Sequence, residues 1–345
     1  MEPHYMTKGR RHDENYSVRI LNPFLEDFVR IRHSKAYRRL ADKTQVISLP
    51  RNVYTRTRLT HTGEVVAIAT TISEALKLNT PLCMAIGEGH DIGHAPYGHL
   101  GEEMLTQILG RTFRHPVGGP IVAQHIEKGK PSGLNLSFET LQGILYHSRT
   151  NSVQLKGISG TPNEYSVVMF ADKIAYTFSD LNDAMRYGFL KNDELPDFVN
   201  FLGKTQNERT YSVLNALINE SKDCGRVEFQ RGEVYQSFIK TREFMFKKVY
   251  KAIDHSIKKV ILQKAHEFLS TEPAFSSVNP EAALLMLTDK QVDALGRCVN
   301  ERGRCRIGDL SGLGISDSLE TLKGKDIDLC DADLGWGDER EREVI

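Results

Sequence analysis

Four residues that can bind a metal ion lie in three well-separated segments of the chain, each of which otherwise has a helical pattern. They are His61, His90, Asp91 and Asp172. An unpaired carboxylate in the apolar stretch around Asp172 would be costly to bury, and a cation would remove that cost. Two neutral imidazoles and two carboxylates suit a divalent metal that keeps positions open for water and substrate. The sequence therefore predicts a fold in which these residues converge on one metal.

The segment around His90 is unusual for a purely structural helix end. Groups that titrate or bind metal crowd ten residues here, namely His90, Asp91, His94 and His99. Glycines are interleaved with them at Gly87, Gly89, Gly93 and Gly98. Because glycine weakens a helix by ~1 kcal/mol relative to alanine, this density indicates that other parts of the chain approach the backbone closely.

Apolar residues recur at helical spacing through most of the chain from about residue 22. Residues 60–78, 98–109 and 163–187 have the clearest helical patterns, and a glycine stops the last two. Strand signals are thin, and the best short candidate is Arg226–Gln230. The pattern predicts an all-α fold.

One helix start carries a local signal of its own. Thr80 is expected to be the N-cap, with Pro81 at the first helical position. The helix that follows should end near His90 and Asp91, because Gly93 and Pro96 would break it.

Changes in composition suggest three parts of the chain. Residues 1–20 are polar and basic without a period, and we expect an N-terminal arm there. Residues 21–270 are expected to form the main helical core. Residues 271–345 are interrupted by proline, serine and asparagine, and we expect a smaller C-terminal helical and irregular segment with an acidic tail.

The overall charge and the cysteines exclude some classes of protein. Lysine plus arginine total 45 and aspartate plus glutamate total 45, which argues against a chain held globally to nucleic acid or to an anionic membrane. No apolar run approaches the ~20 residues that span a bilayer, and the start has no secretory signal. The five cysteines are scattered. We expect a reduced, cytoplasmic protein without a membrane partner.

Longer strings around the four candidate ligands narrow the family. The strings are Tyr37–Val46, Thr55–Val65, His90–Glu102, Gly133–Leu145, Ala171–Tyr176 and Arg242–Tyr250. Over about residues 35–255 the chain resembles HD-domain metal-dependent phosphohydrolases of the deoxyguanosine triphosphate triphosphohydrolase branch. The resemblance implies an HD-domain helical bundle. It also implies hydrolysis of a deoxynucleoside triphosphate, dGTP first among them, to deoxynucleoside and tripolyphosphate, which would control the dNTP pool.

The resemblance also implies a role for each matching residue. Metal ligands would be His61, His90, Asp91 and Asp172. Catalytic residues would be His99, Glu102, His94 and His115. Substrate contacts would come from Gln45, Arg58, Lys173, Tyr176 and Asp180. The metal would be Mn²⁺ or Mg²⁺, with Fe, Co or Ni as alternatives. A homo-oligomer, a hexamer first of all, is implied too, as is binding of single-stranded DNA or a nucleotide effector.

Some of these residues also have plainer interpretations. His99 and Glu102 are spaced to face one way on a helix, where the carboxylate can hold the histidine tautomer and support proton transfer. The same Glu102 would favour the helix dipole without any catalytic role. Arg58 and Lys173 could be phosphate contacts or solvated charges. Two further histidines, His125 and His147, are interpreted as structural or surface residues.

Two other functions remain open from the sequence. The first is an HD hydrolase acting on another phosphate ester, such as a nucleoside monophosphate, a cyclic nucleotide or an alarmone. The second is a protein that uses the pocket only to sense nucleotides or to bind single-stranded nucleic acid. Its basic residues would be Lys8, Arg10, Arg11, Arg30, Arg32, Lys35, Arg38 and Arg39, which a solvated face would also explain.

Overall fold

The computed structural model describes residues 1–14, 22–45, 54–127, 132–148, 157, 160–302, 312 and 314–334. These residues form helices and connecting segments, and the only β-type pairings among them are two isolated bridges, Arg10 with Ser137 and Thr44 with Thr57. The predicted all-α helical bundle is confirmed.

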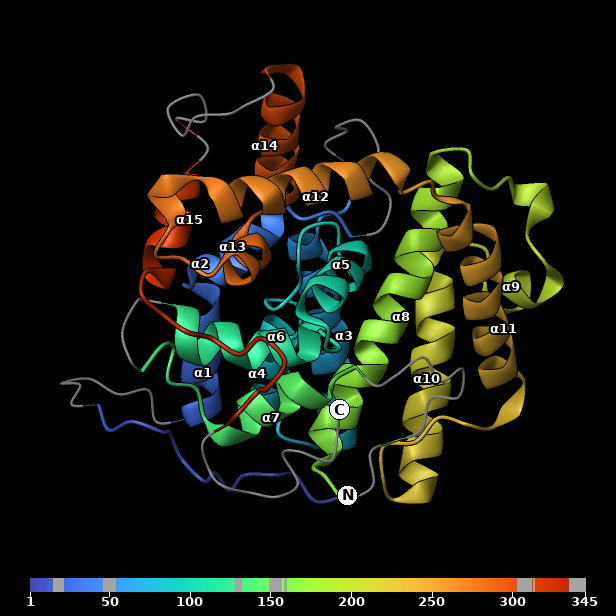
Figure 1. Ribbon diagram of the computed structural model, residues 1–345. Helices are drawn as coiled ribbons and strands as arrows, with labels where there is room; N and C mark the ends of the chain where they lie inside the picture. Colours follow the sequence, from blue (N-terminus) through green and yellow to red (C-terminus); the bar gives the residue numbers. More distant parts are fainter. Residues whose placement is uncertain are drawn as a thin grey trace.

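The α-helices follow one another along the whole chain (Figure 1). In order they are α1 (Pro23–Arg32), α2 (Lys35–Arg39), α3 (Arg58–Leu76), α4 (Thr80–Gly89), α5 (His99–Leu109), α6 (His115–Ile121), α7 (Phe138–Tyr146), α8 (Asn163–Arg186), α9 (Asp197–Leu202), α10 (Gln206–Cys224), α11 (Gly232–Lys248), α12 (Ser256–Thr271), α13 (Pro280–Met286), α14 (Asp289–Arg302) and α15 (Ile315–Leu319). A π-helical turn, Val122–Ile126, continues α6.

Helices α3, α4 and α8 pack against one another and form the centre of the molecule. Most side chains of α8 are buried on every side, as expected for a central helix. Helix α1 covers α4, while α10 and α11 lie along α8 on the opposite side (Figure 1). The central helix α8 is therefore buried against helices from both earlier and later parts of the chain.

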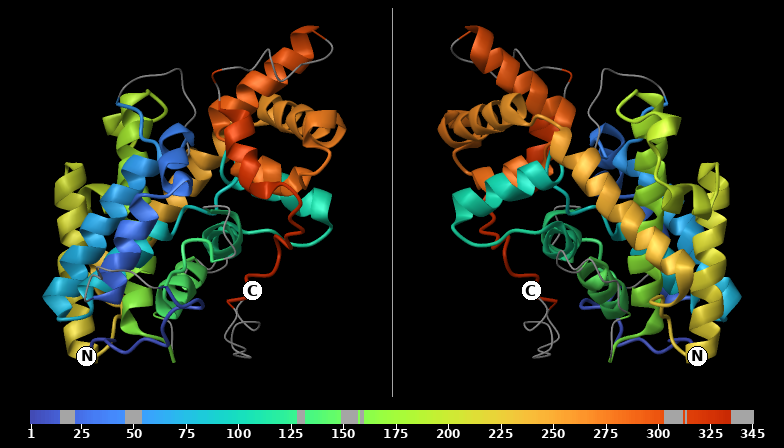
Figure 2. Two further views of the ribbon diagram at one scale, coloured as in Figure 1. Left: turned by 90° about the vertical axis from the view of Figure 1, so that its left-hand side faces the viewer. Right: turned by 90° about the vertical axis from the view of Figure 1, so that its right-hand side faces the viewer.

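The C-terminal helices α12 to α15 lie together at one end of the molecule (Figure 2). Their buried residues, among them Leu262, Leu284, Leu295 and Leu319, belong to the same hydrophobic cluster as the central helices. The cluster connects this end of the molecule directly to the core.

Two local predictions need correction. The N-cap of α4 is Asn79, whose side chain accepts from Leu82 N–H, while the hydroxyl of Thr80 donates to Glu74 instead. The predicted strand Arg226–Gln230 is an irregular segment. Its backbone N–H groups bind side chains rather than another strand: Val227 donates to Asn163, and Gln230 donates to Glu220.

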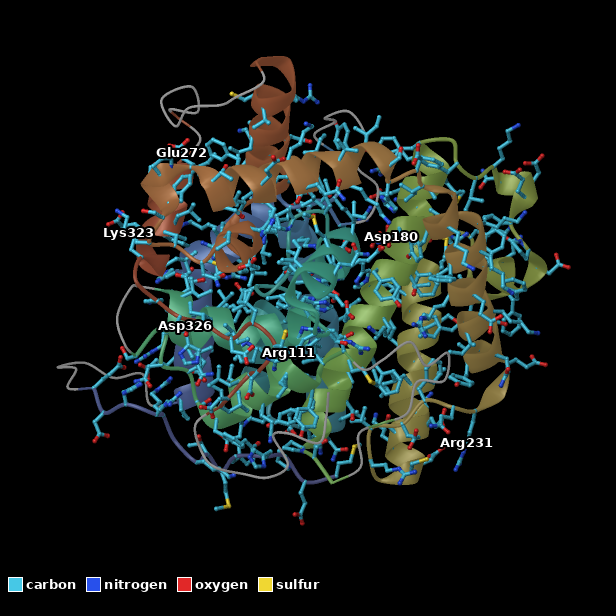
Figure 3. The ribbon with its side chains drawn as sticks, in the orientation of Figure 1. Arg111, Asp180, Arg231, Glu272, Lys323 and Asp326 are labelled. Atoms are coloured by element: carbon cyan, nitrogen blue, oxygen red, sulfur yellow. The ribbon has the colours of Figure 1, made fainter. Side chains whose placement is uncertain are left out.

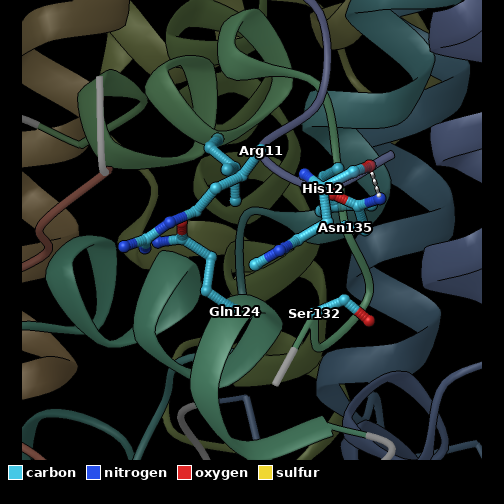
Figure 4. A pocket seen from close by; sticks show the side chains of 7 residues that line it. Arg11, His12, Gln124, Ser132 and Asn135 are labelled. Carbon is cyan, nitrogen blue, oxygen red and sulfur yellow. Dashed lines mark hydrogen bonds between the residues drawn. The ribbon is translucent and has the colours of Figure 1, made fainter. Parts of the chain in front are cut away.

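The N-terminal residues 1–14 lie along the bundle and are fixed by buried carboxylates. His4 N–H donates to Glu164, and the Arg10 guanidinium pairs with Asp27 at 2.5 Å. A small pocket remains beside this segment (Figure 4), lined by Arg11, His12, Gln124, Ser132, Asn135, Leu136 and Leu141.

Two further expectations can be compared with the described residues. None of their helices is long and apolar enough to cross a membrane. Among the described residues, Cys83, Cys224 and Cys330 are free thiols. The outer part of the predicted acidic tail, residues 335–345, lies outside the described residues.

Candidate active site

The packing of α3, α4 and α8 brings the candidate metal ligands together. His61 lies in the first turns of α3, His90 and Asp91 follow the end of α4, and Asp172 lies on α8. His61 Nε2 is 3.1 Å from Asp172 Oδ1, and His90 Nε2 is 3.9 Å from the same oxygen. All are buried.

The ring of His90 has the orientation that a metal ligand requires. Its Nδ1–H donates to the carbonyl oxygen of Gly87 at 2.7 Å, which leaves a lone pair on Nε2. Among the described residues this buried Nε2 has no hydrogen-bond partner, and it faces the two aspartates. Because an unsatisfied buried nitrogen is costly, the donor set of His61, His90 and Asp172 fits a divalent cation with nitrogen and oxygen ligands.

The Asp91 carboxylate lies between the candidate metal ligands and a second group of histidines and a glutamate. Its Oδ1 lies 3.5 Å from His90 Nε2 and 3.1 Å from His94 Nε2, and its Oδ2 accepts from Arg58 at 2.9 Å. Although burial opposes ionisation, the neighbouring His90 and Arg58 hold the pKa of Asp91 well below its usual range. Burial is likewise outweighed at Asp172, where Lys173 keeps the pKa of the carboxyl low. Both carboxylates are therefore available as anionic ligands.

The second group surrounds Glu102 on α5. His99 Nδ1 lies 3.4 Å from Glu102 Oε2, and His115 Nδ1 donates to Oε1 at 2.6 Å. His94 stacks on the His115 ring at 3.6 Å between centroids, and its burial beside Arg58 lowers the pKa of His94 to about 3. The His99 side chain is 83% exposed, whereas Glu102 is nearly buried. His99 is therefore the member of this group that can meet a ligand from solvent.

A histidine without a predicted catalytic role, His147, contacts His115 of this group. His147 is fully buried, its Nδ1–H donates to the carbonyl oxygen of Ile144, and its Nε2 lies 3.3 Å from His115 Nε2. Burial holds the pKa of His147 well below its usual range, so its Nε2 is an acceptor. His147 Nε2 therefore offers an acceptor to the ring nitrogen of His115 that does not face Glu102.

The cations expected to bind phosphate are not solvated charges. Arg58 is only 4% exposed and also donates to the carbonyl oxygen of Gln45 at 3.3 Å. Lys173 donates to Asp172 at 2.9 Å. Gly98 provides room for this arrangement, since a Cβ at its positive φ of 59° would collide with the Arg58 guanidinium.

Tyr176 and Asp180 continue the site along α8 (Asp180 is labelled in Figure 3). Arg242 donates to the Tyr176 hydroxyl at 2.9 Å, and the Tyr250 hydroxyl donates to Asp180 at 2.8 Å. Burial raises the pKa of Asp180 to about 7. Arg242 and Tyr250 had no predicted role, although the string that contains them was among those that matched the family.

Comparisons with known proteins agree with this geometry. A family model described as "HD domain" matches residues 58–177, which contain both histidine groups and Asp172. Deoxyguanosinetriphosphate triphosphohydrolase-like proteins are similar over most of the chain. The one from Caldanaerobacter subterraneus subsp. tengcongensis is 40% identical over 272 residues, covering 76% of each chain.

The chain belongs to the deoxyguanosinetriphosphate triphosphohydrolase-like family. A second relative of the same name, from Clostridium perfringens, is 41% identical over 71% of this chain and 73% of its own. A third, from Desulfatibacillum aliphaticivorans, is 33% identical over 82% of this chain and 83% of its own. Of the predicted site, Gln45 and Asp180 lie outside the matched HD domain.

Proposed function

We propose that this protein hydrolyses a deoxynucleoside triphosphate, dGTP first among them, to the deoxynucleoside and intact tripolyphosphate, with a divalent metal. The main support for the proposal is that two groups of residues lie next to each other, with Asp91 in contact with both. One is the buried donor set around His90 Nε2, and the other is the carboxylate–histidine group that presents His99. The names of the relatives give the substrate class.

The charges of the site suit a triphosphate. The chain as a whole has no net charge, so a substrate with about four negative charges needs local cations. Arg58, Lys173 and Arg242 provide them: Lys173 lies over the Tyr176 ring at 5.4 Å, and Arg242 bonds the Tyr176 hydroxyl. Arginine can bind phosphate oxygens in pairs, and lysine adds a point charge.

The far end of the site suits a sugar. Tyr176 and Asp180 lie one and two turns beyond Asp172 on the same face of α8. The Tyr176 ring offers an apolar face to the deoxyribose. Asp180, held by Tyr250, offers an acceptor to the 3′-hydroxyl. Gln45, whose carbonyl oxygen accepts from Arg58, would contact sugar or base.

The proposed reaction breaks the bond between the α-phosphorus and the 5′-oxygen. Water adds to the α-phosphorus and loses a proton, and the 5′-oxygen leaves with a proton as the deoxynucleoside hydroxyl. His99, held by Glu102, would move the proton at the 5′-oxygen. Arg58 and Lys173 would stabilise the charge on the phosphoryl oxygens. A bound divalent metal would polarise the α-phosphate and make water more acidic.

The nucleic-acid alternative receives little support from the basic residues near α1 and α2. Arg10 pairs with Asp27, Arg30 with Glu26, Arg32 with Glu88, and Arg39 with Glu127. Arg58 and Lys173 are also paired, but with carboxylates that are candidate metal ligands. The carboxylates that pair with the basic residues near α1 and α2 are not candidate ligands and reduce the attraction of these cations to a phosphate backbone. The homo-oligomer and the nucleotide effector remain proposals drawn from the family resemblance.

Product analysis tests the proposal. Purified protein is incubated with Mn²⁺ or Mg²⁺ and each of the four dNTPs, with GTP as the ribonucleotide control. We expect deoxynucleoside and tripolyphosphate, and the relative rates rank the bases. Monophosphate plus pyrophosphate would overturn the proposed bond cleavage. Turnover of a monophosphate or cyclic nucleotide without turnover of dNTPs would favour the other class of HD hydrolase.

A further inference from the structure

We propose that Asp289, in the C-terminal segment, is a positioning residue. It holds the catalytic turn, residues 97–99, in place relative to the substrate-binding segment, residues 43–45. The inference rests on the proposed function and names a residue that neither the sequence patterns nor the family roles assign. Asp289 is the first residue of α14 and is only 5% exposed.

The two oxygens of Asp289 bind two different segments of the core. Its Oδ1 accepts from Tyr97 N–H at 2.8 Å. Its Oδ2 accepts from Thr44 N–H at 2.9 Å and from the Thr44 hydroxyl at 2.5 Å. One turn later on α14, Asp293 accepts from the Tyr97 hydroxyl at 2.5 Å. Two acids of one helix therefore hold the backbone and the side chain of Tyr97.

Tyr97 needs such support because its backbone is strained. Its φ is 58°, in the left-handed region that non-glycine residues rarely adopt. Gly98 follows with φ 59°, and His99 then begins α5. The direction in which His99 leaves this turn therefore depends on how Tyr97 is held.

Thr44 leads into the other side of the site. Thr44 precedes Gln45, whose carbonyl oxygen accepts from the Arg58 guanidinium. It follows Lys43, whose carbonyl oxygen accepts from the backbone N–H of Arg58 at 2.9 Å. The buried Lys43 ammonium also bridges the two regions, since it donates to the carbonyl oxygens of His94 and Leu285. The segment that contains Leu285 and Asp289 thus touches both sides of the site.

One carboxylate consequently sets the spacing between the proton-transfer group and the substrate contacts. In Asp289→Asn an amide NH₂ replaces one acceptor oxygen, so either Tyr97 or Thr44 loses its partner. A misplacement of about 1 Å can lower turnover by about 100-fold. We expect kcat to fall by about 10- to 100-fold, with metal content unchanged.

The test compares Asp289→Asn with Glu281→Gln. Glu281 lies in the same C-terminal segment, and its carboxylate accepts from His266 on α12 rather than from residues 97–99 or Thr44. Amide hydrogen exchange of the metal-loaded full-length proteins is followed in peptides covering residues 43–45 and 94–102. For Asp289→Asn we expect faster exchange in at least one of the two peptides, the one whose residue loses its acceptor. For Glu281→Gln we expect wild-type exchange in both. Tyr97→Phe, which removes only the bond to Asp293, should show a smaller change in the second peptide alone.

Turnover measurements complete the test. Asp289→Asn should lower kcat by a larger factor in the wild-type background than in His99→Ala, because a displaced His99 no longer matters once it is removed. Wild-type exchange in both peptides, or the same fold loss in both backgrounds, would overturn the proposal. If the wild-type protein hydrolyses no dNTP, the proposed function fails, whereas the exchange data still decide whether Asp289 holds both segments.

Discussion

His61 Nε2 lies 3.1 Å from Asp172 Oδ1, although 111 positions separate the two residues in the chain. The contact exists because α3 and α8 pack side by side, and His90 from the end of α4 completes the group. Each residue alone is unremarkable on a helix. Together they form a buried donor set in which His90 Nε2 has no hydrogen-bond partner within the part of the chain that the structure describes.

Asp172→Ala is expected to abolish metal binding and hydrolysis together, because the carboxylate lies beside both histidines. Metal content by mass spectrometry, measured beside dNTP turnover, checks this. The control is Asp223→Ala, which changes an exposed aspartate on α10. An active Asp172→Ala protein without metal would contradict the assignment.

His99→Ala is expected to retain the metal and to lower kcat by about 10²- to 10⁴-fold, the usual contribution of a proton-transfer group. The side chain is exposed and bonded only to Glu102 among the described residues, so its removal leaves the buried group intact. Metal content, thermal stability and kcat are measured together. Loss of metal in this variant would show that His99 has a structural or ligand role instead.

Gly93→Ala is expected to destabilise the protein by about 1–3 kcal/mol, as other overpacked cores are, and to reduce turnover. A Cβ at Gly93 would collide with the backbone of Gly119 and with the carbonyl oxygen of His115, which starts α6. Gly63→Ala is the control, because its Cβ would meet no atom within 4 Å. In a helix interior that change should stabilise by about 1 kcal/mol. Denaturant unfolding of both variants checks the difference, and equal effects would contradict it.

Asp180 should give the metal-free protein a distinctive pH dependence. Burial raises the pKa of Asp180 from 3.8 to about 7. Between these pH values the folded protein holds a proton that the unfolded chain releases, so stability falls as the pH rises through this window. Relative to Asp180→Asn, the wild-type free energy of unfolding should fall by up to about 4 kcal/mol between about pH 4 and pH 8. Urea unfolding at several pH values checks this, and a constant difference would contradict it.

The helical pattern could be predicted because its signals are local, whereas the metal-ligand roles of His61, His90, Asp91 and Asp172 come from the family resemblance and stay a prediction. The predicted helix 60–78 is observed as α3, and the glycine density around His90 corresponds to real close approaches at Gly89, Gly93 and Gly98. The helix that contains Asp172 was also predicted nearly to its ends. Periodicity and glycine spacing are sufficient for such features.

The remaining features depend on contacts between segments distant in sequence. Val227 and Phe229 alternate as in a strand, yet they fill the core from a loop whose N–H groups are bound by side chains. His147 lies within the Glu102 group only because α7 packs on α6. The contact of Asp289 with Tyr97 joins positions 192 residues apart. No local pattern in the sequence indicates such a contact.

Hydrolysis in water labelled with ¹⁸O tests the proposed chemistry most directly. The purified protein, loaded with Mn²⁺, is given dGTP, and both products are analysed by mass spectrometry. Attack at the α-phosphorus predicts one ¹⁸O atom in tripolyphosphate and none in deoxyguanosine. Label in the deoxyguanosine hydroxyl, or release of a monophosphate and pyrophosphate, would contradict the proposed function.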